Sequence, residues 1–172
     1  MKSILTCSPD ELVNRMIDQN IKNGYVIQLD GEVYVSHPSF EELKQFIVNS
    51  PDNYEHEGVF WQADPKTNSL FIAAVHRTNR GAGQGGTRLR QYKTVESVFT
   101  DAIRLAKGMT DKNACAELWW GGGKGVIHPL EQPRALQGED RTTVFANYGR
   151  FIASLNGIYI CAEDMNTNPE DM

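Results

Sequence analysis

From about residue 58 onward, strand-like and helix-like stretches alternate, and this alternation constrains the fold more than any other feature of the sequence. Two apolar runs, GVFWQA and SLFIAAVH, are joined by the turn residues DPKTN and predict a hairpin. Helical spacing follows over 94–109, and again from a cap at Asp140 to a terminator at Gly157. A short strand follows each helix, GVIH and then IYICA. The pattern predicts an α/β fold, a mixed sheet flanked by helices.

The first 53 residues have a pattern of their own. Residues 9–22 show helical spacing, with Ser8 or Asp10 available as a cap. The runs YVIQL and VYV around a DGE turn predict a short hairpin. Ser39 and Glu42 have the spacing of a capping box that opens a second helix. We therefore expect 1–53 to be an N-terminal extension packed on or beside a core domain of residues 54–172.

Composition narrows the function classes. A chain of 172 residues can bury the core of one domain, and its net charge of −5 disfavours nucleic acid as a partner. No run approaches the roughly 18 apolar residues of a membrane span, and the N-terminus lacks the pattern of a signal peptide. Three cysteines without CxxC spacing predict free thiols, no metal site and a cytoplasmic protein. Apolar neighbours predict that Cys115 and Cys161 are buried.

Two glycine motifs invite a nucleotide-binding interpretation that their surroundings disfavour. Gly81-x-Gly83-x-x-Gly86 fits GxGxxG, but it lies in a predicted polar loop over 77–92, remote from the preceding strand and the following helix. The required carboxylate is missing, since Asp101 falls in mid-helix. The segment 121–125, GGGKG, lacks the first glycine and the Ser or Thr of a phosphate loop. We expect a glycine loop at 121–123 without bound nucleotide.

Two lysines and one carboxylate lie in unusual surroundings. Lys112 follows the predicted helix end, Lys124 emerges from the three glycines, and Asp164 follows the strand IYICA. Small and apolar neighbours would desolvate both lysines, lower the pKa of each and make a lysine usable as a base. The glycines would let a substrate or a water approach Lys124. Spacing alone leaves open that Lys124 is a solvated loop charge, that Lys112 complements a helix dipole and that Asp164 is a turn or capping residue.

Five segments in order carry a family resemblance over about residues 54–172. They are GGTR (85–88), GMTDKNACA (108–116), GGGKGVI (121–127), YGRF (148–151) and SLNGIYICAED (154–164). Their content, order and spacing resemble the N-terminal, dimerisation and substrate-binding domain of the Glu/Leu/Phe/Val amino-acid dehydrogenases, with the leucine type the nearest.

This resemblance implies a role for each matching position. Lys124 would be the catalytic lysine that activates the attacking water, and Asp164 would carry protons to and from the substrate amine. Lys112 would bind the substrate α-carboxylate as a charge-assisted pair. Gly85 and Gly86 would form a glycine turn at the pocket, and Met109 would line the side-chain pocket.

The resemblance also implies cofactor and partners. The reaction would be oxidative deamination of an L-amino acid to a 2-oxo acid with NAD or NADP, held by a Rossmann domain that this chain lacks. No cofactor-binding residue is therefore expected within the chain, and the chain alone should be inactive. A homodimer or larger homo-oligomer is expected, with GVFWQA, including Phe60 and Trp61, as a strand for subunit pairing.

Three positions depart from the family pattern. Gln84 stands where leucine-type enzymes have an apolar residue and glutamate-type enzymes have lysine, so substrate preference is open. Trp119 replaces a short Asn, and Asn166 stands where leucine-type enzymes favour Gly. The alternative from another class is a non-catalytic ligand-binding or oligomerisation module that keeps the family fold. A third is a dinucleotide-binding protein that uses Gly81–Gly86.

Overall fold

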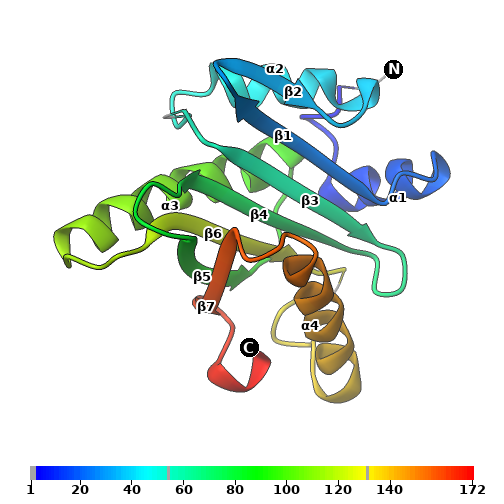
Figure 1. Cartoon of the computed structure of the whole chain (residues 1–172). Coiled ribbons are helices and arrows are strands. Elements are labelled where there is room, and N and C mark those ends of the chain that lie inside the picture. Colours follow the sequence, from blue (N-terminus) through cyan, green and yellow to red (C-terminus); the bar gives the residue numbers. More distant parts are fainter. Residues whose placement is uncertain (1–2, 54, 131) are drawn as a thin grey trace.

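The computed structural model describes residues 3–53, 55–130 and 132–172. Within them, seven strands form one sheet in the order β2-β1-β3-β4-β6-β5-β7 (Figure 1). The strands are β1 (Asn23–Leu29), β2 (Glu32–Val35), β3 (Gly58–Asp64), β4 (Ser69–Arg77), β5 (Gly83–Leu89), β6 (Gly121–His128) and β7 (Tyr159–Glu163). The helices are α1 (Pro9–Asp18), α2 (Glu41–Asn49), α3 (Val95–Cys115) and α4 (Gly138–Ala153), with short 3-10 turns η1 (Pro38–Phe40) and η2 (Pro169–Asp171).

The sheet has an antiparallel part and a parallel part. Strands β2, β1, β3, β4 and β6 pair antiparallel in turn, whereas β5 lies parallel to both β6 and β7. The predicted mixed sheet and the hairpin of β3 and β4 are confirmed. Strand β6 is buried along its whole length, as expected of a strand that helices cover on both faces.

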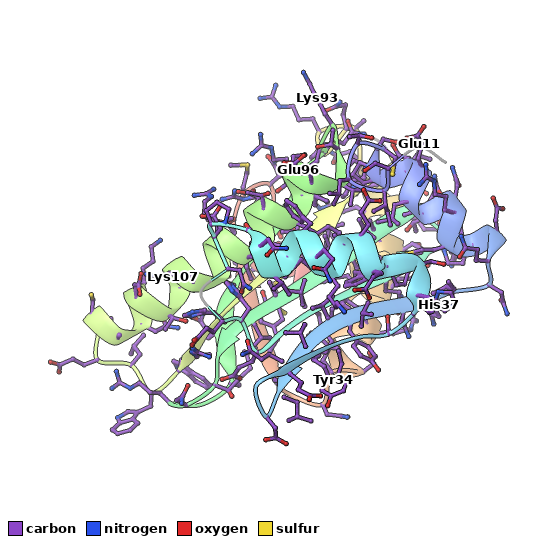
Figure 2. The ribbon with its side chains drawn as sticks, turned by 90° about the horizontal axis from the view of Figure 1, so that it is seen from above. Glu11, Tyr34, His37, Lys93, Glu96 and Lys107 are labelled. Atoms are coloured by element: carbon purple, nitrogen blue, oxygen red, sulfur yellow. The ribbon has the colours of Figure 1, made fainter. Side chains whose placement is uncertain are left out.

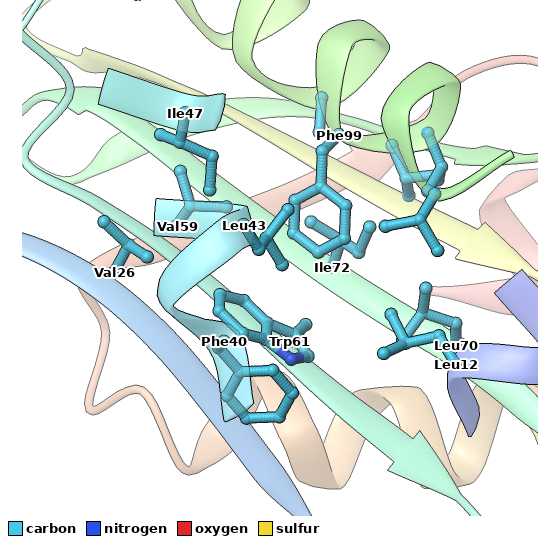
Figure 3. Packing of buried hydrophobic residues seen from close by; sticks show 14 of the residues in the cluster. Leu12, Val26, Phe40, Leu43, Ile47, Val59, Trp61, Leu70, Ile72 and Phe99 are labelled. Carbon is cyan, nitrogen blue, oxygen red and sulfur yellow. The ribbon is translucent and has the colours of Figure 1, made fainter. Parts of the chain in front are cut away.

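Helices α1, α2 and α3 cover one face of the sheet, and α4 covers the other. Figure 2 shows α1, α2 and α3 as neighbours, with Glu11 and Glu96 projecting from their outer surface. The core beneath them is built around Trp61, whose ring meets Phe40 and Phe99 edge-on with centroids 5.0 and 5.3 Å apart (Figure 3). Such aromatic contacts add stability beyond the area that they bury.

The N-terminal segment shares this core. The hairpin of β1 and β2 extends the sheet beyond β3, and buried residues of the segment (Leu12, Val26 and Leu43) pack in the same cluster as Trp61. Ser8 and Glu11 form the capping box of α1. The capping box predicted for Ser39 and Glu42 is wrong.

The side chains of Ser39 and Glu42 form hydrogen bonds to other parts of the chain instead of capping a helix. The Ser39 hydroxyl donates to Gln19 Oε1 at 2.8 Å, and the Glu42 carboxylate accepts from the backbone N–H of Ile4 at 3.0 Å. Glu42 therefore ties the start of the chain to α2, which begins after the 3-10 turn η1 and has no side-chain cap.

Both predicted glycine loops are strands. Residues 83–89 form β5 and residues 121–123 open β6, so the sequence prediction of loops at 77–92 and 121–123 is wrong over these residues. Helix α3 also continues beyond the predicted end at 109, to Cys115, and α4 begins after Gln137, with Asp140 in its first turn rather than as its cap. Glycine has a low propensity for strands. Here, atoms of neighbouring elements occupy the space that a glycine side chain would take, and this close packing favours the strand despite the low propensity.

The strand proposed for subunit pairing lies inside the sheet. GVFWQA is β3, which pairs with β1 on one side and β4 on the other, and Trp61 is fully buried. It offers no free edge to a second chain, so that prediction is wrong. The edges of the sheet are β2 and β7.

Cys7, Cys115 and Cys161 form no disulfide, as predicted. Cys7 is buried, Cys161 is half-buried and Cys115 is exposed at the end of α3, so the expected burial of Cys115 is wrong. In the described part of the chain, no helix combines the length and the apolar character needed to cross a membrane.

Candidate active site

A pocket of about 280 Å³ lies between α3 and the parallel part of the sheet. The structure places six of the seven predicted site residues around it: Gln84, Gly86, Met109, Lys112, Lys124 and Asp164. The seventh, Gly85, lies in β5 directly behind; a β-carbon added there would lie 3.1 Å from Met109 Cγ and only 1.8 Å from the Gly123 carbonyl oxygen. Neither Gly85 nor Gly86 forms the predicted turn, because both belong to β5.

Strand and helix periodicity bring these side chains together. Alternate residues of β5 (Gln84, Gly86 and Arg88) line the pocket, while the residues between them are buried. Opposite them, Leu105, Gly108, Met109 and Lys112 occupy one face of α3.

Lys124 is the buried cation of the site. Its side chain is 5% exposed, and its Nζ donates to Asp164 Oδ2 at 2.8 Å. Burial lowers the pKa of Lys124, and this effect outweighs the opposing attraction of Asp164. A lysine in this setting gives up its proton more readily than one in water.

Asp164 follows β7 and faces the pocket with its side chain 31% exposed. Burial by itself would raise the pKa of this carboxyl, but Lys124, the backbone N–H of Met165 and Arg88 together lower it. The Asp164 backbone N–H donates to the Thr167 hydroxyl at 2.7 Å, which fixes the turn after the strand. The carboxyl is therefore held ionised beside the lysine.

The glycines of β5 and β6 allow neighbouring residues, not a substrate, to pack closely against the two strands. A β-carbon on Gly86 would lie 2.7 Å from Asp164 Cβ, and one on Gly122 would lie 2.0 Å from Thr110 Oγ1 of α3. The prediction that the triple glycine opens a path to Lys124 is wrong, because the Arg77 backbone, α3 and the Tyr159 ring fill the space beside Gly121, Gly122 and Gly123, respectively.

Lys112 differs from its predicted setting. It lies in the last turn of α3, not after the helix, and its side chain is exposed at the mouth of the pocket rather than desolvated. Within the described residues, its ammonium has no hydrogen-bond or ion-pair partner. It is therefore available to an anion that enters the pocket.

Sequence reasoning missed Arg88 and the group that holds it. Arg88 Nε donates to Asp164 Oδ2 at 3.1 Å, and Arg88 Nη1 donates to Asp101 Oδ2 at 2.7 Å. The signal was the alternation of Gln84, Gly86 and Arg88, which becomes visible only if GQGGTRL is taken as a strand. From the sequence, Asp101 is a candidate only for a ribose ligand, and no spacing pattern links it to Arg88.

The glycine motifs do not fit a dinucleotide. Gly83 to Gly86 belong to a strand paired with β7 on one side, and Gly83 and Gln84 pair with β6 on the other, so they form no turn before a helix. Among the described residues, no group of three or more His, Cys, Asp or Glu side chains is arranged to hold a metal ion.

Asn166 and Trp119, two of the residues that depart from the family pattern, each have a defined conformation or contact in the structure. Asn166 adopts a left-handed conformation, with φ of 60°, which glycine and asparagine tolerate better than other residues. Trp119 is 77% exposed on the loop after α3, and the guanidinium of Arg80 lies 5.1 Å from its ring centroid.

Fold and pocket define an amino-acid dehydrogenase-type domain. The L-tryptophan dehydrogenase of Nostoc punctiforme is similar in structure, with a TM-score of 0.61 and 35% identity over 77% of this chain and 36% of that chain. The chain belongs to the Glu/Leu/Phe/Val dehydrogenase family, whose dimerisation domain it matches over residues 61–172.

Two curated relatives show the same similarity. The leucine dehydrogenase of Bacillus subtilis (strain 168) is 43% identical over 121 residues, 70% of this chain and 32% of the relative. The phenylalanine dehydrogenase of Caldalkalibacillus thermarum (strain TA2.A1) is 43% identical over 118 residues, 68% of this chain and 30% of the relative. The chain thus spans about a third of the length of these relatives.

Proposed function

We propose that this chain forms the amino-acid-binding part of an NAD- or NADP-dependent dehydrogenase that converts an L-amino acid reversibly to a 2-oxo acid and ammonia. One observation carries the proposal: the same pocket is lined by buried Lys124, paired with the partly exposed Asp164, and by an exposed Lys112 that has no ion-pair partner among the described residues. Its volume, about 280 Å³, suits a ligand the size of an amino acid.

Lys112 is the proposed site for the substrate α-carboxylate. Its ammonium is exposed at the pocket mouth and can donate charge-assisted hydrogen bonds to an incoming carboxylate. An α-amino acid held there by its carboxylate would direct its α-carbon and amine into the pocket, toward Lys124 and Asp164.

Lys124 and Asp164 are the proposed proton carriers. Oxidation of the amine gives an imino acid, and a water must then add to the imino carbon. Lys124 in its neutral form takes the proton that this water loses, as the lowered pKa of its ammonium favours. Asp164, ionised and with Oδ2 2.8 Å from Lys124 Nζ, accepts a proton from the substrate amine and returns it to the nitrogen after water has added. The C–N bond then breaks, ammonia leaves, and the hydroxyl loses its remaining proton to Asp164 as the 2-oxo group forms.

The hydride acceptor, NAD or NADP, is proposed to bind elsewhere in the complete protein. Neither glycine motif of this chain fits it, since both are strands of the sheet. A second, Rossmann-type domain is the proposed site, and the protein is proposed to work in the cytoplasm as a homodimer or larger homo-oligomer. The family's name for this region, a dimerisation domain, supports the assembly.

The test is an activity assay of the complete protein. A panel of L-amino acids is offered with NAD⁺ and with NADP⁺, and reduction of the nicotinamide is followed by absorbance, with Lys124→Met as the control. Turnover that depends on an amino acid and on Lys124 supports the proposal. Calorimetric binding of an amino acid without turnover on either cofactor would instead indicate a ligand-binding module.

A further inference from the structure

We propose that Arg88 is a positioning residue for Asp164, holding its carboxylate against Lys124 and keeping it ionised. The catalytic meaning of this inference rests on the proposed function, but its electrostatic content does not. Arg88 Nε and Lys124 Nζ bind the same oxygen, Asp164 Oδ2, at 3.1 and 2.8 Å. The carboxylate is thus fixed by two cations from two different strands.

Arg88 is itself held rigidly. Its Nη1 donates to Asp101 Oδ2 at 2.7 Å, and both side chains are almost buried, at 13% and 10% exposure. Asp101 is held in turn by the Tyr92 hydroxyl at 2.7 Å and by Arg104 Nη2, also at 2.7 Å. Arginine suits this place because its planar fork presents donors in two directions at once.

The charge arrangement explains what Arg88 contributes. Beside Asp164, a positive guanidinium stabilises the ionised carboxylate and lowers its pKa. Beside Lys124, the same charge repels the ammonium and helps to lower its pKa, in addition to the larger effect of burial. Arg88 therefore favours an ionised aspartate next to a lysine that releases its proton easily.

Asp101 provides the negative charge that stabilises Arg88 in its nearly buried position beside Lys124. Without it, two cations would face a single carboxylate inside the fold, and buried charges that lack a partner are strongly destabilising. With it, Arg88 and Lys124 balance Asp101 and Asp164, while Arg104 is half exposed to solvent. Asp101 is therefore the counter-ion that allows Arg88 to stand beside Lys124.

The first measurement needs no activity. The pKa of Asp164 is read from the pH titration of its ¹³C-labelled carboxyl by NMR, assigned with Asp164→Asn, in the chain and in Arg88→Gln. Loss of the guanidinium should raise the pKa of Asp164 by about 1, as expected for an opposite charge at this range. Arg88→Lys should restore most of the difference, since it keeps the charge.

Two further variants guard the interpretation. Arg104→Gln removes a guanidinium that binds Asp101 but not Asp164, so its effect on the pKa of Asp164 should be several-fold smaller. If Arg88→Gln does not fold, the double variant Arg88→Gln/Asp101→Asn removes both buried charges together and still lacks the cation beside Asp164. An unchanged pKa of Asp164 in a folded variant without Arg88 would overturn the inference.

Kinetics of the complete protein separate this inference from the proposed function. In Arg88→Gln, the acid limb of the kcat/KM profile should move to higher pH, because loss of the guanidinium raises the pKa of both Lys124 and Asp164, and the proposed mechanism needs Lys124 neutral and Asp164 ionised. An inactive wild-type protein would count against the dehydrogenase proposal, while the NMR titration would still decide the electrostatic role of Arg88. An active wild type with an unmoved acid limb in Arg88→Gln would overturn the positioning role.

Discussion

The side chain of Asp164 lies directly over Gly86, so that a β-carbon added to Gly86 would lie 2.7 Å from Asp164 Cβ and 2.8 Å from the Glu163 carbonyl oxygen. Gly86 belongs to β5 and Asp164 directly follows the neighbouring parallel strand β7, and the missing side chain of Gly86 makes room for Asp164.

Gly86→Ala is therefore expected to displace Asp164 from Lys124. A shift of about 1 Å at a reacting group lowers rates by roughly a hundredfold, so kcat of the complete protein should fall by about that factor. The matched control is Gly149→Ala on α4, where an added β-carbon meets no atom within 4 Å and helix propensity favours alanine. Equal kcat values for the two variants would contradict the argument.

The two lysines should separate in steady-state kinetics. Lys124→Met removes the proposed base and should lower kcat by several orders of magnitude, because no other lysine reaches Asp164 among the described ion pairs. Lys112→Ala should mainly raise KM for the amino acid, since it removes a contact made to both ground state and transition state. Small and similar effects of the two changes would argue against the assigned roles.

Gln84 should influence substrate preference. Its side chain lines the pocket and has no hydrogen-bond partner among the described residues. A bound aliphatic side chain would leave this amide unpaired, at a cost of about 1–3 kcal/mol. Gln84→Leu should therefore raise kcat/KM for leucine about tenfold relative to glutamine. A substrate panel checks this ratio, and an unchanged ratio would place the substrate side chain elsewhere.

His56 should make stability depend on pH. It is buried, with Nε2 2.8 Å from the Ile103 carbonyl oxygen, and burial lowers its pKa from 6.5 to about 4. As the pH falls below 6.5 the unfolded chain takes up a proton that the folded chain refuses until about pH 4. This contribution to stability is complete above pH 6.5 and falls by up to about 3 kcal/mol between those values.

His56→Gln tests this effect. Glutamine keeps a donor for the Ile103 carbonyl but does not titrate, so urea unfolding should show a shallower loss of stability between pH 6.5 and 4.5 than in the wild-type chain. Parallel slopes in the two proteins would show that other groups carry the acid sensitivity.

Local periodicity predicted the apolar elements well and the glycine-rich ones poorly. The hairpin of β3 and β4 could be recognised because its apolar runs and turn residues are local signals. Strand β5 could not, because GQGGTRL becomes a strand only when Asp164 and β6 lie beside it. Contacts between residues far apart in sequence override a local preference for loops.

The same distinction holds for the site. Burial of Lys124 was foreseeable from its apolar neighbours, whereas exposure of Lys112 was not, since it depends on how far α3 extends. Arg88 and Asp101 meet across 13 residues and two elements, and charge pairing of that kind leaves no spacing pattern.

The packing around β6 divides the pocket into positions where a substitution causes a steric clash and positions where a side chain can be exchanged. Lys124 belongs to β6, and the space beside the glycines of this strand is occupied by α3, Tyr159 and the Tyr148 hydroxyl. A β-carbon added to one of these glycines would therefore collide with a neighbouring group. Gln84, Leu105 and Met109, on the surrounding elements, carry side chains that can change size and polarity individually. If the proposed function holds, exchange of these wall residues can change the substrate while Lys124, the proposed base on β6, keeps its place.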